Sequence, residues 1–132
     1  MIVFVDTTAF YASFDATDRY NAAAARAWSD FLERDVSLVT SNYVIVETSA
    51  LLQRRLGMAA VKRLYDTFVP LVSVEWVDAD LDSAAAESLL AADKRDLSLV
   101  DCTSFALMRH LQIRNAFTFD RHFAEQGFTC HP

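Results

Sequence analysis

The sequence contains little of what a loop-rich, secreted or membrane-embedded protein needs. Its 132 residues include only two glycines and two prolines, which argues against a loop-rich or low-complexity chain. No apolar run approaches the roughly 18 residues that a membrane-spanning helix requires. The N-terminus has no basic segment ahead of its short apolar run, so we expect no secretory signal.

Cysteine is also scarce. Cys102 and Cys130 could form one disulfide, but two isolated cysteines in a chain rich in Leu and Val are more typical of free thiols in a reducing cytoplasm. Their spacing matches no zinc-binding pattern. We therefore expect a cytoplasmic protein with free thiols and no contact with a membrane.

Positive charge is in deficit. Twelve Lys and Arg residues face 18 Asp and Glu residues, which leaves a formal net charge of −6. A conventional DNA-binding domain usually presents a basic face to phosphates, so this balance argues against that class. It leaves a nuclease open, because bound cations can supply the missing positive charge.

What the chain does have is apolar residues in a regular arrangement. Hydrophobic residues make up 53% of the sequence and charged residues 23%, as in a globular protein. We find no linker and no internal repeat, so residues 1–132 are predicted to form a single domain, which is long enough to bury a sizeable core.

Short apolar runs alternate with longer helical patterns along the chain. The predicted strands are Met1–Val5, Val36–Val39, Leu71–Trp76, Ala116–Phe119 and Phe128–Cys130. The predicted helices are Ala9–Asp15, Arg19–Arg34, Ser41–Leu56, Met58–Val69, Asp80–Asp93, Ser98–Leu111 and Arg121–Gln126. This alternation implies right-handed crossovers and a mainly parallel central sheet covered on both faces, which is a three-layer α/β/α sandwich.

Two aspartates directly follow predicted strands. Asp6 ends the first apolar run and Asp120 ends the fourth. Ligands of open α/β sheets bind beyond the carboxyl ends of the strands, so both carboxylates are candidate site residues. Thr118 shares a strand face with Asp120, because alternate residues of a strand point the same way.

Two further acids lie on predicted helices. Glu47 has apolar neighbours three and four positions away on both sides, so it is expected to face inward, where its burial requires a cation or a hydrogen-bond donor. Asp101 lies in the first turn of the helix opened by Ser98 and also faces the core side.

Each acid also has a purely structural interpretation. Asp6 and Asp120 could cap the helices that follow them, Asp101 fits the capping-box spacing with Ser98, and Glu47 could pair with Arg54. Four unrelated structural acids with this placement are less plausible than one site. Clustered carboxylates suit Mg²⁺ or Mn²⁺, and the matching chemistry is phosphodiester hydrolysis by a metal-activated water.

Several segments together resemble a PIN-domain ribonuclease, and more narrowly a VapC-type toxin of a toxin–antitoxin pair. The similar segments cover the chain from end to end in the order of the family. They are Val3–Thr8, Val46–Thr48, Leu97–Phe105, Ala116–Phe123 and Gly127–Phe128.

The resemblance implies roles for the acids. Asp6 and Asp101 would be the main metal ligands, Glu47 would bind metal directly or through water, and Asp120 would do the same or orient the attacking water. Thr118 is the polar residue beside the last acid, and Thr118 and Arg121 would contact the RNA substrate. The family further implies Mg²⁺-dependent cleavage of cellular RNA of the tRNA or rRNA type, a homodimer, and a cognate antitoxin whose tail covers the acidic site.

The sequence leaves two possible roles for several other polar and aromatic residues. Arg121 and His122 could touch RNA phosphate or belong to a solvated helix start. A group of basic residues could guide RNA or form a solvated helix face: Arg54, Arg55, Lys62 and Arg63. Trp28 and Trp76 are expected in the core or in a dimer interface.

Two other functions would require different features of the sequence. A haloacid-dehalogenase phosphatase would need a second aspartate where Thr8 stands, and a dinucleotide-binding domain would need a glycine-rich first turn. A catalytically silent binding module that keeps the fold to engage RNA or a protein remains the alternative to the nuclease.

Overall fold

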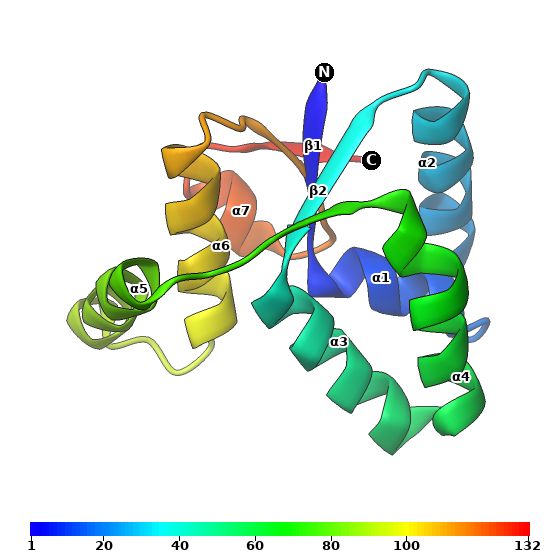
Figure 1. The fold of residues 1–132 in the computed structure, drawn as a ribbon, viewed down its shortest axis with the longest axis horizontal. Coiled ribbons are helices and arrows are strands. Elements are labelled where there is room, and N and C mark those ends of the chain that lie inside the picture. The colour runs from blue at the N-terminus through cyan, green and yellow to red at the C-terminus, as the bar shows by residue number, and fades with distance from the viewer.

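The computed structural model describes all 132 residues, with five strands and helices on both sides of the sheet that they form (Figure 1). The strands are β1 Ile2–Val5, β2 Ser37–Ser41, β3 Ser73–Glu75, β4 Asn115–Phe117 and β5 Thr129–His131. The α-helices are α1 Thr7–Phe14, α2 Asn21–Glu33, α3 Asn42–Arg55, α4 Met58–Arg63, α5 Ala79–Ala92, α6 Leu99–His110 and α7 Arg121–Glu125. A π-helical turn, Leu64–Phe68, and a 3₁₀ turn, Val69–Leu71, follow α4.

The five strands form one parallel sheet in the order β3-β2-β1-β4-β5. The central strand β1 is buried on both faces, and Val3, Phe4 and Val5 are fully shielded from solvent. A continuous apolar run is what such a strand requires. The predicted α/β/α sandwich with a parallel sheet is confirmed.

The helices divide between the two faces of the sheet (Figure 1). On one side α1 and α2 pack together, and Trp28 of α2 contacts Phe10, Phe68 and Phe117. On the other side α6 packs against α5, and Phe105 of α6 meets Phe123 of α7 edge to face. Trp28 therefore belongs to the core, as expected. None of the helices has the length and apolar character that a membrane crossing needs.

Some predicted boundaries are wrong, for physical reasons that matter at the site. Strand β4 ends at Phe117 and not at Phe119, because the chain leaves the sheet where the Phe119 N–H bonds to the Thr8 hydroxyl. Strand β3 has three residues, since the 3₁₀ turn at Val69–Leu71 occupies the start of the predicted strand. Trp76, just after β3, is 77% exposed and is not a core residue.

Helix α3 positions one functional side chain at the carboxyl end of the sheet. It starts directly after β2, where the Ser41 hydroxyl caps it by accepting a hydrogen bond from the Val44 N–H. It then contacts both α1 and α6, so that it lies between the two helical layers. Residues from both layers and from β1 therefore meet at this edge of the sheet.

Candidate active site

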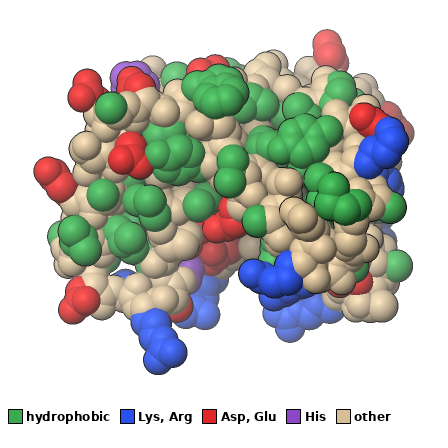
Figure 2. All heavy atoms as spheres, turned by 60° about the horizontal axis from the view of Figure 1, so that its bottom comes forward, with side chains coloured by type: hydrophobic (Ala, Val, Ile, Leu, Met, Phe, Trp, Pro, Cys, Tyr) green, Lys and Arg blue, Asp and Glu red, His purple; other side chains and the backbone are tan.

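The four predicted acids gather at the carboxyl end of the sheet. Asp6 follows β1, Glu47 lies on α3, Asp101 lies in the first turn of α6, and Asp120 precedes α7. Figure 2 shows acidic side chains in a central hollow, with Lys and Arg side chains on both sides of it. We call the four carboxylates the acidic cluster.

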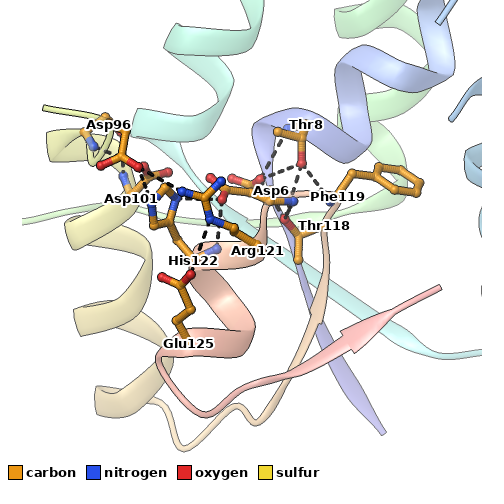
Figure 3. Close-up of polar contacts among 11 residues, drawn as sticks. Asp6, Thr8, Asp96, Asp101, Thr118, Phe119, Arg121, His122 and Glu125 are labelled. Atoms are coloured by element: carbon orange, nitrogen blue, oxygen red, sulfur yellow. Dashed lines mark hydrogen bonds and ion pairs between the residues drawn. The ribbon is translucent and has the colours of Figure 1, made fainter. Parts of the chain in front are cut away.

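Asp6 is almost completely buried, with 2% of its surface exposed. One of its oxygens, Oδ2, accepts hydrogen bonds from the Thr8 hydroxyl at 2.8 Å, the Thr118 hydroxyl at 3.0 Å and the Thr8 N–H at 3.3 Å (Figure 3). These donors fix the carboxylate at the start of α1. They leave the other oxygen, Oδ1, without a protein partner.

Asp101 and Asp120 are held in the same way. Asp101 forms the capping box of α6, in which its Oδ2 accepts from the Ser98 N–H at 3.0 Å and the Ser98 hydroxyl accepts from the Asp101 N–H. Asp120 caps α7, and its Oδ1 accepts from the His122 N–H at 2.9 Å. In each case one oxygen is engaged within the protein and the second is free.

For three of the acids, helix capping and membership of one site are therefore compatible. Asp6, Asp101 and Asp120 are helix caps, as the local sequence allowed, and they also meet in one cluster. The positive ends of the helices that they cap point toward the cluster and favour negative charge there. The alternative ion pair between Glu47 and Arg54 is not present.

Burial raises the pKa values of three of the carboxylates, and neighbouring charges add to the rise. Burial raises the pKa of Asp6 to about 7, against the opposing effect of the Thr8 hydroxyl, and the charge of Asp101 adds to the rise. Burial likewise raises the pKa of Asp101, with a further contribution from Asp120. Glu47 follows the same pattern, because burial and the charges of Asp101 and Asp120 raise its pKa while the adjacent Thr7 hydroxyl lowers it.

His122 is the residue whose position the sequence did not predict. It is not solvated, because only 11% of its side chain is exposed and it lies between two carboxylates. Its Nδ1 is 2.7 Å from Asp120 Oδ1, and its Nε2 is 3.2 Å from Asp96 Oδ2 (Figure 3). Burial lowers the pKa of His122, but the two carboxylates raise it more.

The sequence contained a signal for the contact between His122 and Asp120. A side chain two residues after an N-capping aspartate lies in the first turn of the helix, within reach of the cap. Asp96 carried no such signal, since it lies in the loop before α6 and reaches His122 only through the fold.

Thr118 and Arg121 were predicted to bind substrate. Thr118 is 4% exposed, and its hydroxyl binds Asp6 and accepts from the Asp120 N–H. In this structure the Thr118 hydroxyl positions Asp6 and Asp120, and its contact with RNA stays a prediction. Arg121 is exposed but pairs with Asp96 and Glu125.

The donor set of the cluster fits a divalent cation. Hard cations such as Mg²⁺ prefer carboxylate oxygens and keep several waters. Three fixed carboxylates here offer one free oxygen each, and Glu47 adds a fourth acid. Donor atoms of Asp101, Asp120 and His122 lie within 4.8 Å of one another, which is close enough to share an ion.

Comparison with known proteins gives three kinds of similarity. A family model described as PIN domain matches residues 3–128. The chain is 41% identical over 128 residues to the 23S rRNA-specific endonuclease VapC20 of Mycobacterium tuberculosis, covering 96% of this chain and 95% of that protein.

Solved structures agree in fold. The crystal structure of Mycobacterium tuberculosis VapC20, described as a sarcin–ricin loop cleaving toxin, superimposes with a TM-score of 0.86 over the full length of both chains. FitAcB from Neisseria gonorrhoeae has a TM-score of 0.70 at 16% identity, covering 100% of this chain and 97% of that one. FitAB bound to an IR36 DNA fragment has a TM-score of 0.68 at 16% identity, with 98% and 93% covered. At 16% identity the last two show the fold alone.

Proposed function

The chain belongs to the PIN-domain family, and on this premise we propose that it is a metal-dependent endoribonuclease toxin that cleaves ribosomal RNA. One observation carries the proposal. Four acids from separate segments meet at the carboxyl end of the sheet, and three of them have one oxygen fixed by the protein and one free. The 41% identity to a 23S rRNA-specific endonuclease over nearly the whole chain supports rRNA rather than tRNA as the substrate.

We propose that Asp6 and Asp101 hold Mg²⁺, for which Mn²⁺ is a plausible substitute. Glu47 and Asp120 would bind the ion directly or through water, and Asp120 would otherwise orient the attacking water. A bound divalent ion lowers the pKa of a water and stabilises charge on the attacking and leaving oxygens of a phosphodiester.

Neighbouring residues hold the carboxylates of the acidic cluster in fixed positions. Thr8 and Thr118 hold the Asp6 carboxylate, and Ser98 holds that of Asp101, so little reorganisation is needed when substrate binds. His122 holds Asp120 from the side of the loop that carries Asp96. We therefore treat Thr8, Thr118 and His122 as positioning residues and the four acids as catalytic residues.

The protein partners in this proposal follow the family. We propose a homodimer in the cytoplasm, neutralised by a cognate antitoxin whose tail lies over the acidic cluster. Exposed large apolar side chains supply surface for such contacts, among them Val46 at 66%, Trp76 at 77% and Leu90 at 78% exposure.

The experiment uses purified protein freed of any partner. Intact ribosomes, isolated 23S rRNA and total tRNA are each incubated with the protein and Mg²⁺, with and without EDTA, and the RNA ends are mapped. We expect one discrete cut in 23S rRNA that EDTA abolishes, with the sarcin–ricin loop as the first site to examine.

The matched variant is Asp6→Asn, which keeps the shape and the hydrogen bonds of the side chain but removes its charge. We expect at least 100-fold slower cleavage, because removal of one electrostatic group of an active site costs about 10²–10³ in rate. Cleavage that persists in EDTA or in Asp6→Asn would contradict the proposal. RNA binding without cleavage in the wild type would favour the silent binding module.

A further inference from the structure

A second hollow lies directly beside the acidic cluster. Thr7 and Thr8, which follow Asp6 at the start of α1, form part of its lining, and the cavity measures about 220 Å³. The Thr8 hydroxyl that lines it is 2.8 Å from Asp6 Oδ2, so whatever binds there lies next to the acidic cluster. Pockets for drug-sized ligands run from about 300 to 1,000 Å³, so this one suits a smaller group.

The walls of this pocket are aromatic and apolar. Tyr20 and Phe119 contribute two stacked rings, whose centroids are 4.5 Å apart and whose planes differ by 10°. The Arg19 guanidinium lies 4.6 Å from the centroid of the Tyr20 ring and extends this stack. Tyr11 and Leu51 line the pocket from α1 and α3. The stacked layers make a rigid wall that exists before any ligand binds.

Two polar groups of opposite character also line the pocket. Arg55, at the end of α3, is exposed, and its guanidinium lies 5.3 Å from the centroid of the Tyr11 ring, where it interacts with the Tyr11 hydroxyl and with the charge of Asp15. Asp18 accepts a hydrogen bond from the Tyr20 N–H with Oδ1, while Oδ2 has no protein partner. The pocket therefore offers the several N–H donors of the Arg55 guanidinium and an unpaired acceptor oxygen of Asp18.

We propose that this pocket, formed by Tyr11, Asp18, Tyr20, Leu51, Arg55 and Phe119 next to Asp6, binds one unpaired base of the RNA adjacent to the scissile phosphate. The inference rests on the proposed endoribonuclease function and specifies how that function selects its cleavage site. Arg55 and Asp18 read the polar edge of the base, and the aromatic wall packs against the base itself.

A nucleobase fits these features better than a peptide side chain does. Proteins read the sequence of RNA mainly in loops and bulges, where they hold splayed bases against aromatic rings and guanidinium planes and bind their polar edges. An apolar side chain would leave the free oxygen of Asp18 unpaired and would offer no acceptor to Arg55. The adjoining acids repel the RNA backbone, and a cation bound at the acidic cluster would offset this repulsion. Arg55 would contact the neighbouring base in the pocket.

The first experiment measures base preference. Synthetic sarcin–ricin hairpins carry each of the four bases at the two positions on either side of the mapped cut, and kcat/KM is measured with Mg²⁺ for the wild type and Arg55→Gln. Arg54→Gln is the matched control, because it removes the same charge from an exposed neighbour on the same helix that does not line the pocket.

We expect Arg55→Gln to reduce the discrimination between bases at one flanking position by roughly 5- to 150-fold, the range for loss of a well-placed pair of hydrogen bonds to a base. Arg54→Gln should leave that ratio unchanged, because loss of a positive charge alone weakens binding about equally for all sequences. Asp18→Asn should change which base is preferred at the same position.

The second experiment detects the base in the pocket before cleavage. The hairpin carries the fluorescent base 2-aminopurine at each flanking position in turn, and its emission is recorded with Mg²⁺ present on binding to the slowly cleaving Asp120→Asn variant, because without a cation the acidic cluster repels the RNA. We expect quenching at the position identified by Arg55→Gln, and loss of that quenching in Tyr20→Leu, which keeps an apolar side chain but removes the ring.

The outcomes separate this inference from the proposed function. Equal base ratios for Arg55→Gln and Arg54→Gln at every position, or no quenched position, would overturn the inference while Mg²⁺-dependent cleavage still supported the function. Unchanged ratios combined with weaker capture of a protein inhibitor by Arg55→Gln would assign the pocket to a peptide and would also overturn it. Failure of the wild type to cleave 23S rRNA would overturn both.

Discussion

At the scale of single residues, the main feature is that the acids do two things at once. A helix N-cap uses one carboxylate oxygen and fixes the side chain, and Asp6, Asp101 and Asp120 all do this. The second oxygen then points to the cluster without freedom to move away. Capping and metal binding are therefore compatible roles of one side chain.

The raised pKa of Asp6 makes the stability of the metal-free protein depend on pH. Its pKa is about 7 in the folded state against an ordinary 3.8, so the folded state binds this proton more tightly than the unfolded state. The free energy of unfolding is therefore highest below about pH 4 for this group and falls as the pH rises toward 7. Each pKa unit corresponds to about 1.4 kcal/mol, so the fall amounts to a few kcal/mol.

The measurement is urea unfolding in EDTA from pH 4 to pH 8. Asp6→Asn removes the titrating group and should flatten this dependence, with higher stability than the wild type at pH 8. Glu87→Gln, a change at an exposed acid on α5, serves as the control and should keep the wild-type slope. A wild-type slope in Asp6→Asn would contradict the assignment.

His122 is predicted to act through Asp120. His122→Phe keeps a ring in the buried space but loses the imidazole contacts with Asp120 and Asp96, so the carboxylate of Asp120 is held by the backbone N–H of residue 122 without the ring. Loss of a partner that orients a metal ligand typically costs 10- to 100-fold in activity or metal affinity. We expect a fall of this size in kcat, with little change in KM for RNA.

The conservative variant distinguishes positioning from packing. The amide of His122→Asn can reach Asp120 from about the place of Nδ1 and should restore part of kcat, although it fills the space less well than phenylalanine. If His122→Asn were as slow as His122→Phe, a positioning role would not hold.

At the scale of secondary-structure elements, the N-terminus of α6 couples helix stability to site geometry. Ser98→Ala removes the hydroxyl that accepts from the Asp101 N–H. We expect the free energy of unfolding to fall by about 0.5–2 kcal/mol, which is the usual effect of losing such a cap. Activity should fall as well, since the first turn of α6 carries Asp101.

The matched control lies in the middle of α5. Ser83 is exposed there and forms no side-chain hydrogen bond, so Ser83→Ala should leave stability unchanged or slightly higher, because alanine is the better helix former. Urea unfolding and cleavage assays of both variants make the comparison. Similar stability for Ser98→Ala and Ser83→Ala would contradict a role for the cap.

The connection after β4 shows how an element boundary serves the site. The Thr118 N–H still bonds to the His131 carbonyl of β5 while its hydroxyl reaches Asp6, and the chain then leaves the sheet so that the Phe119 N–H bonds to Thr8. A strand that continued through Phe119 would have kept the Phe119 N–H from Thr8.

At the scale of the whole molecule, the acidic cluster should make metal binding and folding interdependent. Mg²⁺ or Mn²⁺ that binds only the folded state raises its stability, by about 2.7 kcal/mol at a concentration of 100 times Kd. We expect the melting temperature of the wild type and of Glu87→Gln to rise with metal concentration. Asp101→Asn, which can retain its cap hydrogen bond, should show little rise, and an equal shift in this variant would contradict the proposed site.

Much of the architecture could be predicted because it depends on local patterns. The apolar run of β1 and the Ser98 cap of α6 are local features, and the structure has both. The predicted end of β4 was wrong because Phe119 belongs to the apolar run in the sequence, whereas its backbone N–H donates to the Thr8 hydroxyl and not to a neighbouring strand. Thr8 lies more than a hundred residues away in the chain.

The sequence by itself determined which four acids to consider, since strand ends and helix faces follow from the order of residues. Only the tertiary structure decided that His122 lies between Asp96 and Asp120, that Thr118 serves Asp6, and that Arg55 and Asp18 line one pocket. The physical reason is range. Capping and periodicity act over a few residues, whereas the contacts that complete the site join segments that meet only after the chain has folded.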